Sequence, residues 1–313
     1  MKKVEFTFRS SDQKTPIHAI KWEPDQPPHA ILQIAHGMAE YIDRYDSFAQ
    51  ILCACGILVV GNDHLGHGES VVSSSDWGYF AEQDGEGCVL RDIHRLKKLT
   101  QTSYPQTPYF LLGHSMGSFF VRRYLCKYSQ DALSGAILSG TGHYAPARTV
   151  SGMLLTRLIQ LFRGWHYRSP LMDRLITGNM NKSFQPERTP KDWLTRDESV
   201  VDAYIEDERC GFVYTLNGYY NLLRAAEQME RLELLRHMNR DTPVLLISGE
   251  DDPVGDFGKG VKQIAVEFRK VGMKQVDCIL YPHMRHEILN ELGKENVYKD
   301  IVQFVAVKIR DHL

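Results

Sequence analysis

The chain has 313 residues, of which 24% are charged and 43% are hydrophobic, and its formal net charge at pH 7 is −2. This length allows a large buried core, and the lack of a basic excess excludes nucleic acid as a favoured partner. The six cysteines form no CxxC pair and lie mostly inside apolar runs, which favours reduced thiols and a cytoplasmic location. The N-terminus lacks the pattern of a signal peptide, and no apolar run reaches the roughly 18 residues that cross a bilayer. We expect a soluble protein, at most peripheral to a membrane.

The first predicted elements are two strands with alternating side chains. Residues 4–8 and 17–22 flank a polar stretch and predict an antiparallel pair. Short apolar runs then alternate with helix-length segments, which indicates an α/β fold with a mostly parallel central sheet and helices on both faces. The strands predicted for that sheet are 30–35, 58–60, 109–112, 135–139, 243–248 and 276–281.

A glycine-containing turn follows the strand predicted at 30–35. Its residues are His36-Gly37-Met38-Ala39-Glu40. A carbonyl under nucleophilic attack becomes an oxyanion, which needs preorganised N–H donors, and we nominate the backbone N–H of Met38 as one donor. His36 could be read as a base, but its place beside this turn favours a structural hydrogen bond, and we count it among the candidate pocket residues.

The next loop, residues 63–70, holds two histidines and two acids. Its sequence is Asp63-His64-Leu65-Gly66-His67-Gly68-Glu69-Ser70. The spacing fits no standard zinc pattern on a helix, and the glycines suit a tight loop that borders a site. We therefore expect neither a metal nor a cofactor.

The pentapeptide Gly113-His114-Ser115-Met116-Gly117 lies between the strand predicted at 109–112 and an apolar helical run. A serine at such a turn has strained backbone geometry and an exposed hydroxyl, and flanking glycines avoid clashes with the neighbouring strand and helix. The new helix points free N–H groups at whatever the serine attacks. We predict that Ser115 is a nucleophile, that the N–H of Met116 is the second oxyanion donor, and that His114 lies at the pocket.

Residues 141–240 contain no strand-like run of similar quality. We expect a helical cap inserted into a core made of residues 1–140 and 241–313. The apolar stretch within 150–184 would by default pack the cap onto the core. The alternative is a lipid-facing groove, with Leu154 and Leu158 as pocket candidates. Surface arginines are ordinarily solvated, but four could meet anionic headgroups if the cap contacts a membrane, namely Arg157, Arg163, Arg168 and Arg174.

A serine nucleophile needs a base and a third group that fixes the tautomer of that base. Asp252 follows the strand predicted at 243–248, and we prefer it over Asp251 because the next residue is proline, which restricts its backbone. His286 follows the last predicted strand, and we prefer it over His283, which follows a proline in the turn. The resulting chain order of serine, acid and histidine is the one expected for hydrolases with a nucleophile on a strand-to-helix turn.

These motifs resemble those of the monoacylglycerol lipase and lysophospholipase branch of the α/β-hydrolase superfamily, of the serine aminopeptidase S33 type. The resemblance implies an α/β-hydrolase fold, catalytic roles for Ser115, Asp252 and His286, and oxyanion donors at Met38 and Met116. Two positions depart from the pattern of the branch. His283 stands where relatives often have glycine, and Tyr41 replaces a histidine, so both are candidate residues that narrow or polarise the pocket.

The sequence thus predicts a cofactor-free serine carboxylester hydrolase acting on monoacylglycerols or lysophospholipids through an acyl-serine intermediate. Two other enzymes remain open, an esterase for short or aromatic acyl groups and a peptidase of the S33 type. A non-catalytic ligand receptor on the same fold is a remote alternative. The expected partner is a small-molecule or lipid ester, and no protein partner is implied.

Overall fold

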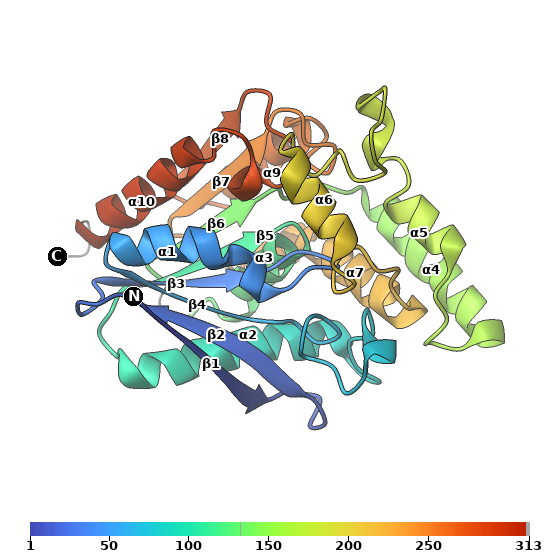
Figure 1. The fold of residues 1–313 in the computed structure, drawn as a ribbon, viewed down its shortest axis with the longest axis horizontal. Helices are drawn as coiled ribbons and strands as arrows, with labels where there is room; N and C mark the ends of the chain where they lie inside the picture. The colour runs from blue at the N-terminus through green and yellow to red at the C-terminus, as the bar shows by residue number, and fades with distance from the viewer. Residues whose placement is uncertain (132, 311–313) are drawn as a thin grey trace.

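The computed structural model describes residues 1–131 and 133–310. Eight strands form one sheet in the order β1-β2-β4-β3-β5-β6-β7-β8 (Figure 1). β1 (Lys2–Arg9) and β2 (Pro16–Glu23) are antiparallel to each other, and β2 is antiparallel to β4. The remaining strands run parallel from β4 to β8. Their bounds are β3 (Ala30–Ala35), β4 (Ile57–Asn62), β5 (Tyr109–His114), β6 (Gly135–Ser139), β7 (Val244–Gly249) and β8 (Val276–Tyr281).

Helices cover both faces of the sheet because the side chains of a strand alternate between its faces. Leu32 and Leu112 belong to the hydrophobic cluster on one face, together with Phe48 of α1 and Ile301 of α10. On the other face, strand side chains such as Leu111 pack with the second cluster. The first face carries α1 (Asp46–Ala54) and α10 (Glu295–Arg310), and the second carries α2 (Gly85–Ser103), α3 (Met116–Lys127) and α9 (Lys259–Lys270).

A helical insertion, residues 141–240, connects β6 to β7, and no strand of the sheet lies in it. Its helices are α4 (Pro146–Arg163), α5 (Pro170–Ile176), α6 (Glu198–Glu206), α7 (Leu216–Met229) and α8 (Leu232–Leu235). α7 packs on α2 and α3 and belongs to the same hydrophobic cluster as they do. α4 packs on α7, and Figure 1 shows α4 and α5 at the side of the molecule, away from the sheet.

Short 3₁₀ helices occupy four connections. They are η1 (Ile42–Tyr45), η2 (Ser74–Asp76), η3 (Met180–Ser183) and η4 (Ile288–Asn290). Within residues 1–131 and 133–310, no helix combines the length and the apolarity that a bilayer crossing requires.

The predicted strands and the α/β class, with a mostly parallel sheet and helices on both faces, are confirmed, with the ends of several strands shifted by one or two residues. The sheet order places β5 between β3 and β6. Because the carboxyl ends of parallel strands meet at one edge of a sheet, the loops after β3, β5, β7 and β8 converge there. These loops contain the residues that we predict to act as nucleophile, base, orienting acid and oxyanion donors.

Candidate active site

Ser115 stands on the turn between β5 and α3 with φ 51° and ψ −120°. This backbone conformation is unusual for a residue with a side chain and costs about 1–3 kcal/mol. The neighbouring strand β6 holds Ser115 in place, because the Ser115 N–H donates to the carbonyl of Ser139, the last residue of β6, at 2.9 Å. The first turn of α3 adds a second restraint, since Ser118 Oγ donates to the Ser115 carbonyl at 2.6 Å.

The two glycines of the pentapeptide are required by close backbone contacts. A Cβ atom on Gly117 would collide with the carbonyl oxygens of Ala35 and His36. A Cβ atom on Gly113 would lie 2.5 Å from the Gly117 carbonyl oxygen. The start of α3 is therefore pressed against the end of β3, which brings Ser115 next to the turn that contains Met38.

Asp252 and His286 form a buried pair on the loops after β7 and β8. The His286 Nδ1–H points at the carboxylate, with 3.0 Å to each of Asp252 Oδ1 and Oδ2. Asp252 is fully buried, and its carboxylate also accepts from Val254 N at 2.9 Å and from Ser248 Oγ at 3.2 Å. These bonds fix the carboxylate, so the carboxylate in turn fixes the tautomer and the ring plane of His286.

The electrostatics of the pair favour a basic imidazole. Burial lowers the pKa of His286, but the charge and the hydrogen bond of Asp252 outweigh burial and raise the pKa above its ordinary value of 6.5. Burial raises the pKa of Asp252, but His286 outweighs it and leaves the carboxyl pKa below 3.8. Beside them, burial and the His286 charge lower the pKa of His114 to about 3, so this ring, 4.8 Å from that of His286, stays neutral.

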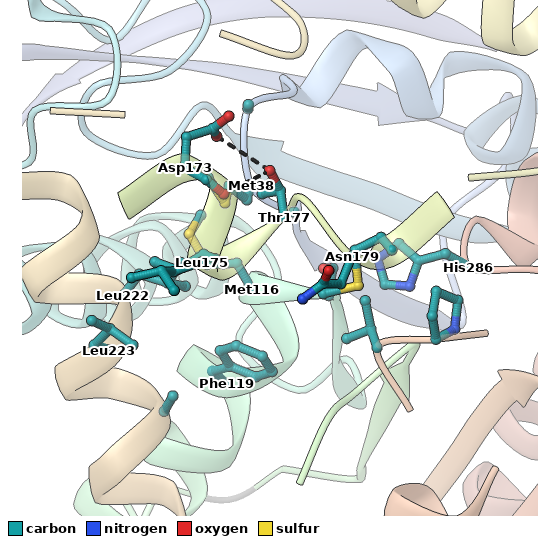
Figure 2. A pocket seen from close by; sticks show the side chains of 18 of the residues that line it. Met38, Met116, Phe119, Asp173, Leu175, Thr177, Asn179, Leu222, Leu223 and His286 are labelled. Atoms are coloured by element: carbon teal, nitrogen blue, oxygen red, sulfur yellow. Dashed lines mark hydrogen bonds between the residues drawn. The ribbon is translucent and has the colours of Figure 1, made fainter. Parts of the chain in front are cut away.

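Ser115, His286, Met38 and Met116 line one cavity of about 790 Å³ (Figure 2). Its walls combine the turn after β3, the start of α3 and residues of the helical insertion. Many of the insertion's side chains there are apolar, including Leu155, Met172, Leu175, Ile176, Leu222 and Leu223. A serine on a strained turn, a buried histidine–aspartate pair and an apolar cavity thus meet at the carboxyl edge of the sheet.

A family model described as serine aminopeptidase, S33, matches residues 26–293. The chain belongs to this family. It is 38% identical over 296 residues to a monoglyceride lipase homolog of Monkeypox virus, which covers 94% of this chain and 95% of that protein. It is 35% identical over 300 residues to the monoglyceride lipase of Homo sapiens, which covers 91% of this chain and 85% of that protein. A carboxyl esterase from Bacillus coagulans, solved in complex with glycerol, matches with a TM-score of 0.91 and 29% identity over 99% of both chains. The protein is therefore an α/β-hydrolase.

In this S33-family hydrolase, His114 lines the cavity as predicted, whereas three other predicted pocket residues do not. His36 is completely buried behind the turn, where its Nδ1–H donates to the Gly37 carbonyl at 2.8 Å and its Nε2 accepts from His64 N at 2.9 Å. Tyr41 donates to Asp207 at 2.6 Å and lines a separate hollow. His283 is exposed in the turn after β8, with φ 62°.

Leu154 and Leu158 were expected at the pocket and also lie outside it. Both project from the outer side of α4 and remain 64% and 55% exposed. Gly152 and Leu155 of the same helix line the cavity instead. Adjacent helical positions differ by about 100° around the axis, so the step from Leu155 to Leu154 turns the side chain away from the cavity.

A buried charged triplet that the sequence did not reveal supports the turn after β3 and the loop after β8. Arg44 donates to Glu40 at 2.5 Å and to the two oxygens of Glu287 at 3.0 and 2.8 Å. Glu40 accepts from the N–H of Gly37 in the turn after β3, and Glu287 directly follows His286. Burial raises the pKa of Glu287, but Arg44 outweighs it and holds the carboxyl pKa well below its ordinary value. The triplet joins the turn after β3 to the loop of His286, and losing one member of such a buried group costs about 3–5 kcal/mol.

The histidines of the 63–70 loop are structural in this hydrolase. His67 Nδ1–H donates to the Leu65 carbonyl at 3.0 Å, and His67 Nε2 accepts from the hydroxyl of Tyr214. Burial lowers the pKa of His64 to about 3 and that of His67 to about 4, so both rings are neutral. Both rings pack against His36, the residue that follows β3, at ring-centre distances of 4.2 Å for His64 and 5.1 Å for His67.

Among the described residues, one group has the donor atoms that a metal ion could use. His143, Glu230 and Glu267 place a nitrogen and two carboxylate oxygens within 4.8 Å of one another. Glu230 already has a cationic partner, since Arg122 Nη1 lies 3.4 Å from its carboxylate. We assign this group an ion-pair role between the helical insertion and α9.

Proposed function

We propose that the protein is a serine carboxylester hydrolase that cleaves monoacylglycerols or lysophospholipids. The observation that carries the proposal is the presence of Ser115 and the buried Asp252–His286 pair at one apolar cavity. The names of the relatives, which are lipases and a carboxyl esterase, support ester hydrolysis as the reaction class.

In the proposed mechanism, His286 takes the proton of Ser115 as the oxygen attacks the ester carbonyl. Asp252 holds the imidazole in the required tautomer and stabilises the imidazolium. His286 then gives the proton to the leaving alcohol, which departs and leaves an acyl-Ser115 ester. A water molecule, deprotonated by His286, releases the fatty acid and regenerates the serine.

The developing oxyanion is proposed to accept hydrogen bonds from the backbone N–H groups of Met38 and Met116. Met116 is the first residue of α3, so its N–H has no acceptor within the helix. Met38 lies on the opposite turn, whose conformation depends on the Glu40 contact with Gly37. Removing one such donor typically costs about 10²–10³ in kcat.

The apolar wall favours a fatty acyl group over a peptide amine. Leu155 of α4, with Leu175 and Ile176 of α5, contributes from the stretch for which the sequence left a lipid groove open. A short acidic pocket would suit a peptide amine, but Glu40 and Glu287, two of the carboxylates at the cavity, are paired with Arg44. The S33-type peptidase and the short-chain esterase thus have less support than the lipid ester hydrolase.

The experiment that tests this function measures hydrolysis of p-nitrophenyl esters from acetate to palmitate, with monoacylglycerol and lysophosphatidylcholine alongside. We expect kcat/KM to rise with chain length, because each methylene buried in the cavity contributes about 0.8 kcal/mol. Activity confined to acetate and butyrate would move the function to a short-chain esterase, and activity on aminoacyl amides alone would move it to a peptidase. If none of these substrates were hydrolysed, the non-catalytic ligand receptor would become the better-supported hypothesis.

We also propose that the helical insertion acts as a cap that contacts a lipid surface. The outer side of α4 exposes Leu154 and Leu158, together with Leu161 (74% exposed) and Phe162 (81% exposed). Arg157 and Arg163 of the same helix could meet anionic headgroups. Leu175 of α5 is half exposed and also lines the cavity, so an acyl chain could pass from such a surface to Ser115.

The double substitution Leu161→Glu and Phe162→Glu tests the lipid-contacting surface. We expect it to lower vesicle binding in a sedimentation assay by about tenfold or more, because two large side chains lose their apolar environment. Hydrolysis of a short-chain ester in free solution should be unchanged. Val72→Glu is the matched control, since Val72 is 74% exposed but lies outside the insertion. Equal vesicle binding by all three proteins would contradict the proposed contact.

A further inference from the structure

Lys191 is a half-buried cation on the wall of the catalytic cavity. Among residues 1–131 and 133–310, no carboxylate pairs with its ammonium and no acceptor receives a hydrogen bond from it. Its Nζ lies over the Tyr204 ring at 5.9 Å from the ring centre, a cation–π contact, and a Cβ atom on Gly211 would lie 3.6 Å from its Cε. Half-burying an unpaired ammonium is unfavourable unless something in the cavity compensates for it.

The backbone that carries this side chain is held by its neighbours in the chain. Asp192 accepts hydrogen bonds from Arg188 N at 2.6 Å and from Thr189 Oγ1 at 2.6 Å, which closes a turn around Lys191. Thr189 Oγ1 in turn accepts from Lys191 N at 3.2 Å. The ammonium is thus presented by a structured segment.

That segment lies against the catalytic histidine. The ring of Trp193 is 5.0 Å from the ring of His286, and the Trp193 carbonyl accepts from His286 N at 3.4 Å. On its other side, Lys191 contacts Tyr204 and Gly211, which both donate to the Ala39 carbonyl in the turn after Met38. The segment 191–193 therefore contacts the histidine loop through Trp193 and lies, through Lys191, beside the residues that bond to the turn after β3.

This is the side at which the leaving group must depart. His286 protonates the leaving alcohol, so that alcohol has to lie on the histidine side of Ser115. The acyl chain occupies the apolar wall formed by residues such as Phe119, Leu222 and Leu223, which lie together in Figure 2. The cation on the wall of the same cavity is a candidate partner for the headgroup of that leaving alcohol.

The other charged groups at this end of the cavity leave the cation available. Glu40 and Glu287 are paired with Arg44. Asp173 attracts Lys191 but makes its hydrogen bonds with the Tyr219 hydroxyl at 2.7 Å and with Thr177 Oγ1 at 3.2 Å. Burial lowers the pKa of Lys191, and a bound anion would restore it.

We infer that Lys191 forms an anion subsite for the leaving alcohol, and that the preferred substrates are lysophospholipids whose glycerophosphate headgroup carries a net negative charge. A phosphate oxygen would accept a charge-assisted hydrogen bond from the ammonium, replacing the partner that the protein itself does not supply. This inference rests on the proposed function and specifies its substrate class.

The test compares two substrates with the same decanoyl chain, lysophosphatidylglycerol and monoacylglycerol, both below their micelle concentrations. We expect Lys191→Met to raise KM for the anionic substrate about tenfold or more and to leave KM for the neutral one within about twofold. Lys182→Met is the matched control, because Lys182 is an exposed lysine of the same insertion. Lys182→Met should leave KM unchanged for both substrates.

A second measurement does not depend on turnover. Titration calorimetry of glycerol 3-phosphate into Ser115→Ala protein should give binding that Lys191→Met abolishes and that inorganic phosphate reproduces only weakly. Equal effects of Lys191→Met on both substrates, or binding that survives the substitution, would overturn the subsite. If no ester were hydrolysed at all, the proposed function would fail, and the calorimetric result would still decide the role of Lys191.

Discussion

Replacing Ser115 by alanine should reduce kcat/KM for fatty acyl esters by about 10⁴-fold or more, because the oxyanion donors and the cavity remain but no acyl-enzyme can form. The same change should abolish covalent labelling by a fluorophosphonate, which reacts with an activated serine. Mass spectrometry of the labelled peptide identifies the modified residue. The fold should survive, since the turn is held by backbone hydrogen bonds of Ser115 that alanine retains.

Ser151→Ala is the appropriate comparison for this prediction. Ser151 also lines the cavity, but its hydroxyl donates to the Arg148 carbonyl within α4, and no histidine or carboxylate accepts from it among the described residues. That variant should keep its labelling and most of its activity. If Ser115→Ala protein were still labelled and still turned over esters, the nucleophile would have to be another residue, and the proposed mechanism would be wrong.

The strands could be predicted from the sequence because a buried parallel strand is a short apolar run with turn residues at its end. Their order in the sheet could not. β4 lies outside β3, next to β2, although it follows β3 in the chain. Pairing between strands depends on contacts that are distant in sequence, and the alternation of apolar runs does not encode them.

The predicted catalytic residues each stand in the turn or loop that follows a strand, and this is why sequence reasoning could find them. Ser115, Asp252 and His286 follow β5, β7 and β8. The residues that support them left no such signal. Arg44 reaches Glu287 across 243 positions, and Trp193 contacts His286 from the helical insertion. Only the i to i+4 spacing of Glu40 and Arg44 could have suggested part of this network.

The cavity residues were the least predictable part of the site. Leucines recur throughout α4, and which of them face inward depends on how that helix packs on α7. The sequence favoured Leu154 and Leu158, whereas Leu155 lines the cavity. Lys191 went unnoticed because a single lysine in a polar stretch is ordinarily a solvated surface residue.

Asp252→Asn should lower kcat/KM by about 10⁴-fold, the loss expected when the base is held in the wrong tautomer. Asparagine keeps the size of the side chain, so the loss would report the charge and the acceptor that His286 Nδ1–H requires. Asp251→Asn is the matched control, because Asp251 is the neighbouring acid and its side chain makes no hydrogen bond among the described residues. Similar losses in both variants would contradict the assignment of Asp252.

The pH profile of the wild type gives an independent check of the same pair. The base must be neutral, so kcat/KM should fall as the pH drops through the pKa of His286, and Asp252 places that pKa above 6.5. Without the Asp252 charge, the residual activity of Asp252→Asn should show an acid limb at lower pH, because burial alone lowers the pKa of His286. An acid limb that stays in place would mean that Asp252 does not set the basicity of His286. The orienting group would then have to be sought elsewhere, beginning with Glu287 and its partner Arg44.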